Sequence, residues 1–160
     1  MPAEPALRSA GILLYRESDG SLQFLIGHMG GPFWSRRDEG AWSIPKGEYA
    51  PDEDPQAAAR REFTEELGLP VPDGPWQALG DVRQPRGKVV TVWALKGDLD
   101  PTQVTPGTFT MEWPPRSGRL QEFPEIDRVE WCDLDTARTR LVTGQREFLD
   151  RLLALWRASQ

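Results

Sequence analysis

Three glutamates that could bind a divalent cation lie close together in the sequence. They are Glu62, Glu65 and Glu66, in the segment GEYAPDEDPQAAARREFTEELGL, which runs from Gly47 to Leu69 and contains no lysine. On a helix the three carboxylates would share roughly 100° of arc, beside the stripe that faces the core. Carboxylates this close repel one another, and oxygen-only ligation favours a hard cation, Mg²⁺ or Mn²⁺. The spacing therefore predicts a metal site at the edge of a buried helix face.

The same segment resembles the Nudix box, the signature motif of the Nudix hydrolases. The match consists of Gly47, five residues, Glu53, seven residues, and then REFTEELGL from Arg61 to Leu69. At average residue frequencies, a chance match in a chain of this length has a probability on the order of 10⁻⁸ to 10⁻⁷. The resemblance implies a hydrolase that cleaves a nucleoside diphosphate linked to another moiety, by attack of water on a phosphorus.

The resemblance also implies roles for individual residues. The implied metal ligands are the backbone oxygen of Gly47 and the carboxylates of Glu62, Glu65 and Glu66. Metal ions there would neutralise phosphate charge and lower the pKa of bound water. Glu53 would support the cluster through Arg61, whose guanidinium can bind a carboxylate with two nitrogens. The general base is left open between Glu65, inside the motif, and Glu122 or Glu125, outside it.

Residues outside the motif are candidates for binding the substrate. Lys46 precedes Gly47 directly and could reach a phosphate. Trp34 and Arg36 combine an aromatic ring with a cation, which suits a nucleobase with its phosphates, although Trp34 could instead anchor a long loop. Arg83, with Arg86 and Lys88 around the turn PRGK, could meet distal phosphates.

The residues before the motif narrow the choice of substrate. The lead-in WSIPKG is similar to the Trp-x-x-Pro-Lys-Gly of dinucleoside polyphosphate and diphosphoinositol polyphosphate hydrolases. It favours a polyphosphate substrate, while nucleoside triphosphates and ADP-ribose-like compounds stay open. The alternative function is a non-catalytic Nudix-fold module that senses a nucleotide. Such modules typically lose carboxylates from the motif, and this chain keeps them all.

The elements that must position these residues can be predicted from local signals. Asp54 as N-cap, Pro55 at the first position and Gly68 at the C-terminus predict a helix over 55–67. Strands are predicted at 9–15, 22–29, 42–44, 76–83, 88–96, 109–113 and 128–132, long loops at 30–40 and 100–122, and helices at 134–141 and 148–156. This order is compatible with the fold that the resemblance implies, a Nudix-type α/β/α sandwich with a mixed β-sheet, in a single domain over residues 1–160.

Composition restricts the partners and the location. The chain has 160 residues and a net charge of −6, which argues against a general nucleic-acid binder. Seven acids and two bases between Glu48 and Glu66 account for most of this excess. The single Cys132, the absence of a long apolar stretch and a Met1–Ala6 segment unlike a signal peptide predict a cytoplasmic protein without membrane spans. We expect a small-molecule nucleotide as ligand, and many relatives in the family form homodimers.

Overall fold

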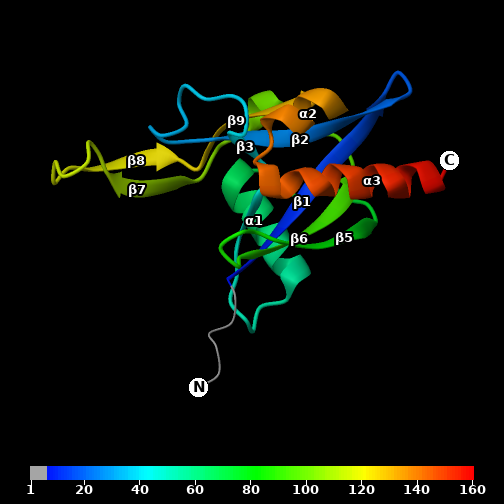
Figure 1. Cartoon of the computed structure of the whole chain (residues 1–160), viewed down its shortest axis with the longest axis horizontal. Helices are drawn as coiled ribbons and strands as arrows, with labels where there is room; N and C mark the ends of the chain where they lie inside the picture. The colour runs from blue at the N-terminus through cyan, green and yellow to red at the C-terminus, as the bar shows by residue number, and fades with distance from the viewer. Residues whose placement is uncertain (1–6) are drawn as a thin grey trace.

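A mixed β-sheet between helices forms the body of this computed structural model, which describes residues 7–160 (Figure 1). The strands of this sheet are β1 (Arg8–Ser18), β2 (Ser21–Met29), β3 (Trp42–Ser43), β4 (Lys46–Glu48), β5 (Trp76–Arg83), β6 (Val89–Lys96) and β9 (Ile126–Cys132). Their order is β3-β2-β1-β6-β5, with β4 paired to β1 and β9 to β2. Only β1 and β6 run parallel among these described pairs, so the sheet is mixed as predicted.

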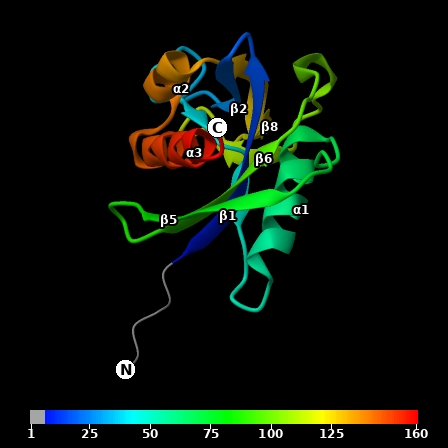
Figure 2. The ribbon, with the colours of Figure 1, turned by 90° about the vertical axis from the view of Figure 1, so that its right-hand side faces the viewer.

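Helices cover both faces of the sheet. On one face, α1 (Pro55–Leu67) buries Phe63 and Leu67 against Ile12 and other β1 residues. On the other face, α2 (Leu134–Arg140) and α3 (Arg146–Ala158) bury a second cluster that includes Phe148. Figure 2 shows α1 and α3 on opposite sides of β1 and β6. Strand β1 is therefore apolar on both faces, and the predicted α/β/α sandwich is confirmed.

Both ends of α1 lie where the sequence predicts them. The Asp54 carboxylate accepts a hydrogen bond from the Ala57 N–H at 2.9 Å, which satisfies a free donor of the first turn. Gly68 ends the helix with a left-handed φ of 69°, and its N–H donates to the Thr64 carbonyl. These caps fix the ends of the helix, and the spacing of the buried Ala59, Phe63 and Leu67 sets the face beside which the glutamates lie.

The segment predicted as a long loop at 100–122 contains more regular structure than expected. It begins with a short 3₁₀ helix, η1 (Pro101–Gln103), and continues into the hairpin of β7 (Thr108–Glu112) and β8 (Leu120–Pro124). The predicted strand at 109–113 corresponds to β7, whereas β8 was not predicted. The hairpin projects from the body of the molecule in Figure 1 and buries few side chains; β7 (TFTME) alternates polar and apolar residues, whereas the exposed β8 (LQEFP) does not, which is why only β7 was predicted.

Two further predictions differ in detail or cannot be compared. The helix predicted to include Leu141 ends at Arg140, and a second 3₁₀ helix, η2 (Thr143–Gln145), precedes α3. No helix within residues 7–160 has the length and apolar character needed to span a bilayer. The prediction about Met1–Ala6 concerns residues outside those that the structure describes.

Candidate active site

A cleft of about 480 Å³ brings α1, β4 and the start of β7 together. It is lined by Lys46, Gly47, Glu48, Glu62, Glu65, Glu66, Lys88, Gly107, Thr108 and Glu125. Five of these residues are carboxylates and two are lysines. The cleft thus gathers the three predicted metal-binding glutamates with Gly47 and Lys46, and it adds groups from distant parts of the chain.

Strand β4 lies directly against the glutamates of α1. A Cβ at position 47 would overlap the Glu62 carboxylate, so any residue other than glycine would make this flexible side chain move. The backbone N–H of Lys46 donates to Oε2 of Glu66 at 3.2 Å. The backbone of β4 therefore holds one carboxylate by a hydrogen bond and makes room for another.

Arg61 connects the remaining acids of the motif. Its Nε and Nη2 donate to the two carboxylate oxygens of Glu53 at 2.9 and 3.0 Å, which is the predicted two-nitrogen pairing. Its Nη1 donates to Glu62 at 2.8 Å and to Glu65 at 3.3 Å. One guanidinium therefore orients three carboxylates. Nη1 alone contacts Glu62 and Glu65, the two that line the cleft.

Exclusion of water shifts the pKa of several groups in the cleft. Burial raises the pKa of Glu66, which is only 8% exposed, to about 8, and the nearby Glu125 and Glu62 add to the rise. Burial also raises the pKa of Glu62. Burial lowers the pKa of Lys46, and the neighbouring Lys88 contributes in the same direction. Groups perturbed together in one cleft are typical of a functional site.

The oxygen atoms of the cleft suit a hard cation, although the three carboxylates of α1 accept hydrogen bonds from other groups of the protein. In the described residues, no three Asp, Glu, His or Cys side chains converge closely enough to hold one ion. The reason is that Glu62 and Glu65 turn to Arg61 while Glu66 turns to the Lys46 N–H. All available donors are oxygens, which fits Mg²⁺ or Mn²⁺. A cation that took Glu62 and Glu65 would displace only the Nη1 contacts of Arg61 and leave its pairing with Glu53 intact.

The two candidate bases outside the motif occupy different places. Glu122 lies in β8 opposite Thr110, is exposed and does not line the cleft. Glu125 lines the cleft. Its backbone N–H donates to the Gly107 carbonyl at 2.8 Å, and its carbonyl accepts from the Gly30 N–H at 2.9 Å. Backbone bonds on both sides therefore fix Glu125 beside the glutamates of α1.

The predicted substrate-binding residues outside β4 do not line the cleft. Trp34 packs against the core cluster that includes Phe148, with the Arg37 guanidinium 5.7 Å from its ring, and Arg36 is exposed on the same loop. Arg83 is exposed at the end of β5. Of the basic residues around the turn PRGK, Lys88 reaches the cleft instead. The roles of Trp34, Arg36 and Arg83 remain predictions.

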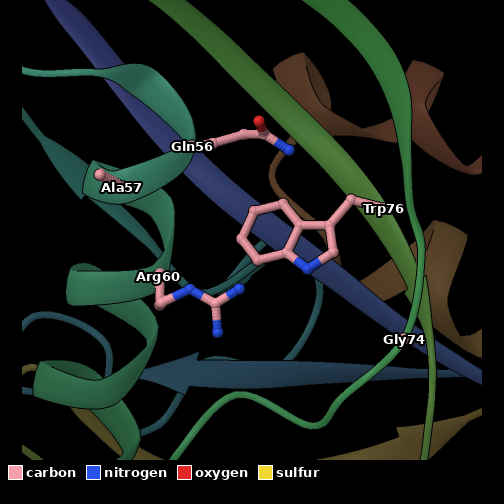
Figure 3. Close-up of a pocket in the computed structure, with 5 residues that line it drawn as sticks. All are labelled: Gln56, Ala57, Arg60, Gly74 and Trp76. Atoms are coloured by element: carbon pink, nitrogen blue, oxygen red, sulfur yellow. The ribbon is translucent and has the colours of Figure 1, made fainter.

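A second hollow lies on another face of α1 (Figure 3). Its volume is about 320 Å³, and it is lined by Gln56, Ala57, Arg60, Gly74 and Trp76. The Arg60 guanidinium lies 5.0 Å from the centre of the Trp76 ring. Arg60 is about 160° around the helix from Glu62. No carboxylate lines this hollow, so the acids of α1 serve only the first cleft.

Comparisons with known proteins agree with this architecture. The model of the NUDIX domain family matches residues 5–152, which include the whole cleft. An RNA pyrophosphohydrolase of Rhodospirillum rubrum is 29% identical over 161 residues, covering 96% of this chain and 93% of that protein. A C. elegans Ap4A hydrolase, solved as a binary complex, superposes with a TM-score of 0.64 at 21% identity, covering 96% of this chain and 99% of that one. The NUDIX domain of Shewanella oneidensis NrtR, complexed with ADP ribose, gives a TM-score of 0.64 at 16% identity, covering 96% and 90%.

Proposed function

We propose that this chain, which belongs to the NUDIX domain family, is a metal-dependent hydrolase of nucleoside diphosphate-X compounds. It would cleave a diphosphate linkage by attack of water on phosphorus. The observation that supports this proposal is the cleft in which Glu62, Glu65 and Glu66 meet two lysines. The relatives named RNA pyrophosphohydrolase and Ap4A hydrolase support pyrophosphohydrolase activity in general.

The acidic wall of the cleft would hold the metal. Glu62, Glu65, Glu66 and the backbone oxygen of Gly47 are the proposed ligands of Mg²⁺ or Mn²⁺. When bound, the metal supplies a Lewis acid and a bound water of lowered pKa. Glu53 and Arg61 would act indirectly, because their pairing keeps Nη1 of Arg61 beside the ligands and orients them.

The other groups of the cleft would bind the phosphates and move a proton. Lys46 and Lys88 place two cations beside the carboxylates, where they can neutralise the charge on the diphosphate. Glu125 is well placed to accept a proton from the attacking water, since backbone bonds hold it in the same cleft. Glu65, which is exposed at the cleft, is the alternative base.

We infer that the substrate carries several phosphates. Two lysines in one cleft suit a polyphosphate, as the lead-in before Gly47 also indicates. Dinucleoside polyphosphates are therefore the favoured candidates, while nucleoside triphosphates and ADP-ribose-like compounds, the latter with only two phosphates, stay open. The relative named RNA pyrophosphohydrolase adds an RNA to this set, although the net charge of −6 favours a small nucleotide. We place the reaction in the cytoplasm and propose that the protein forms homodimers.

Hydrolysis of a nucleotide panel tests the proposal. Diadenosine polyphosphates, nucleoside triphosphates, ADP-ribose and a 5′-triphosphorylated RNA are incubated with Mg²⁺, Mn²⁺ or a chelator, and the products are separated by chromatography. We expect metal-dependent cleavage of at least one compound, and loss of that cleavage in a folded Glu66→Gln variant. Near wild-type turnover in this variant would exclude the metal site. Binding of a nucleotide without any product would instead favour the alternative, a nucleotide-sensing module.

A further inference from the structure

A buried glutamine at the end of η2 forms hydrogen bonds with the segment between β3 and β4, which leads into the active site. Gln145 is 1% exposed, and its Oε1 accepts a hydrogen bond from the Ile44 N–H at 2.8 Å. Its Nε2 donates to Oγ of Ser43 at 3.0 Å, and this hydroxyl in turn donates to the Ile44 carbonyl at 2.8 Å. Both ends of the carboxamide are therefore bound to the two residues that precede Pro45.

The backbone before Gln145 runs along the same strand. Leu141 and Trp42 form a parallel bridge, and the Val142 N–H donates to the Trp42 carbonyl at 2.9 Å. The side chain of Gln145 then satisfies the Ile44 N–H, where η2 has already turned the backbone away. The backbone of 141–142 thus pairs with Trp42, and the side chain of Gln145 continues this pairing to Ile44.

The contacts of this strand continue directly into the cleft. Proline restricts φ at position 45, and the Pro45 carbonyl accepts from the Ile12 N–H at 3.2 Å. The next residue, Lys46, donates its N–H to Glu66. Only two peptide units therefore separate the bond made by Gln145 from the bond that orients a proposed metal ligand.

We propose that Gln145 is a positioning residue, which holds β4 at the distance that the glutamates of α1 require. A displacement of Ile44 would move the Lys46 N–H away from Glu66 and shift Gly47 against Glu62. Misplacement of catalytic groups by about 1 Å can lower a rate by about 100-fold. The activity part of this inference rests on the proposed function, whereas the positioning of the carboxylates can be measured by metal binding alone.

The main variant is Gln145→Met, which keeps the length of the side chain and removes both hydrogen bonds. We expect Mn²⁺ affinity, measured by electron paramagnetic resonance, and kcat each to fall by about 10-fold, with KM changed by less than about 2-fold. Ser43→Ala is the matched control, because it keeps the bond between Gln145 and the Ile44 N–H. We expect this control to retain both values within about 2-fold.

A second control separates positioning from general destabilisation. Leu152→Val shortens a buried side chain of α3 in the same core cluster and leaves the hydrogen bonds of Gln145 in place. All proteins are compared at a temperature at which each is folded by circular dichroism. If Gln145→Met and Leu152→Val have the same Mn²⁺ affinity and kcat, Gln145 is only a core residue and the proposal is wrong.

Two outcomes outside this comparison are also informative. If Gln145→Met does not fold, Gln145→Asn replaces it, since the shorter side chain withdraws the carboxamide from Ile44 but stays polar. Wild-type Mn²⁺ affinity in Gln145→Asn would then overturn the proposal. If the wild-type protein binds Mn²⁺ but hydrolyses no nucleotide, the proposed function fails, and the Mn²⁺ affinities of the variants still decide the role of Gln145.

Discussion

Replacing Glu66 by glutamine should stabilise the metal-free protein at alkaline pH, although the same change should remove activity. Glu66 is 8% exposed, and burial raises the pKa of its carboxyl from 4.5 to about 8. In the absence of a cation, the folded protein therefore keeps this group protonated at neutral pH. Above that pH, folding has to leave a charge in a site that water does not solvate.

The sign and the size of the effect follow from proton linkage. Between the two pKa values, the folded state binds one more proton than the unfolded state, so stability falls as the pH rises. The slope is about 1.4 kcal/mol per pH unit in the middle of this window and about half of that at the folded pKa. Between about pH 6 and about pH 8, Glu66 should therefore cost about 2 kcal/mol of stability. Glutamine does not titrate and avoids this loss.

The measurement is urea unfolding in a chelator at both pH values. From about pH 6 to about pH 8, we expect the free energy of unfolding of the wild-type protein to fall by about 2 kcal/mol more than that of Glu66→Gln. The other ionisable groups are common to both proteins. Glu48→Gln is the matched control, because Glu48 lines the same cleft, is exposed and does not contribute to the pKa shift of Glu66, so this variant should lose as much stability as the wild type. An equal fall in the free energy of unfolding in the wild type and in Glu66→Gln would refute the reasoning. Added Mn²⁺ should restore stability to the wild type alone.

Three further substitutions test other parts of the site and of its helix. Gly47→Ala should lower kcat by about 100-fold without unfolding the protein, because the new methyl group would displace the Glu62 carboxylate; an active variant would show that β4 can move away. Glu53→Gln should lower kcat by about 10-fold with little change in melting temperature, since the pairing with Arg61 is partly exposed and mainly orients other groups. Gly68→Ala should lower the free energy of unfolding by at least about 1 kcal/mol, because its φ is 69° and a Cβ would lie 2.5 Å from a carbonyl oxygen. Unchanged urea midpoints would contradict the last prediction.

Local signals predicted the helix of the site because its ends are determined locally. Asp54 bonds to an N–H three residues along the chain, and Gly68 adopts the left-handed conformation that glycine tolerates best. The two-nitrogen pairing of Arg61 with Glu53 was likewise predictable, because it joins residues of one motif. The mixed sheet was implied by the resemblance to the Nudix box, and the short strands separated by turn residues were compatible with it.

Residues brought in from other elements could not be identified in the same way. Glu122 and Glu125 look alike in the sequence LQEFPEID, and only the backbone bonds to Gly30 and Gly107 show which one enters the cleft. Lys88 was one of several basic residues near a turn, and the register of β6 decides that it lines the cleft. Gln145 carries no local signal, since its partners lie about a hundred residues earlier in the chain.

Strand β1 obtains one of its neighbours only after most of the sheet has been synthesised. It pairs in parallel with β6, so that Arg8 lies opposite Val89. Because β1 is apolar on both faces, a nascent chain that ends before β6 exposes an apolar strand with an unpaired, aggregation-prone edge. Pairing over such a separation slows folding and lengthens the time during which aggregation competes. During synthesis, β1 thus stays open to aggregation until β6 has been made.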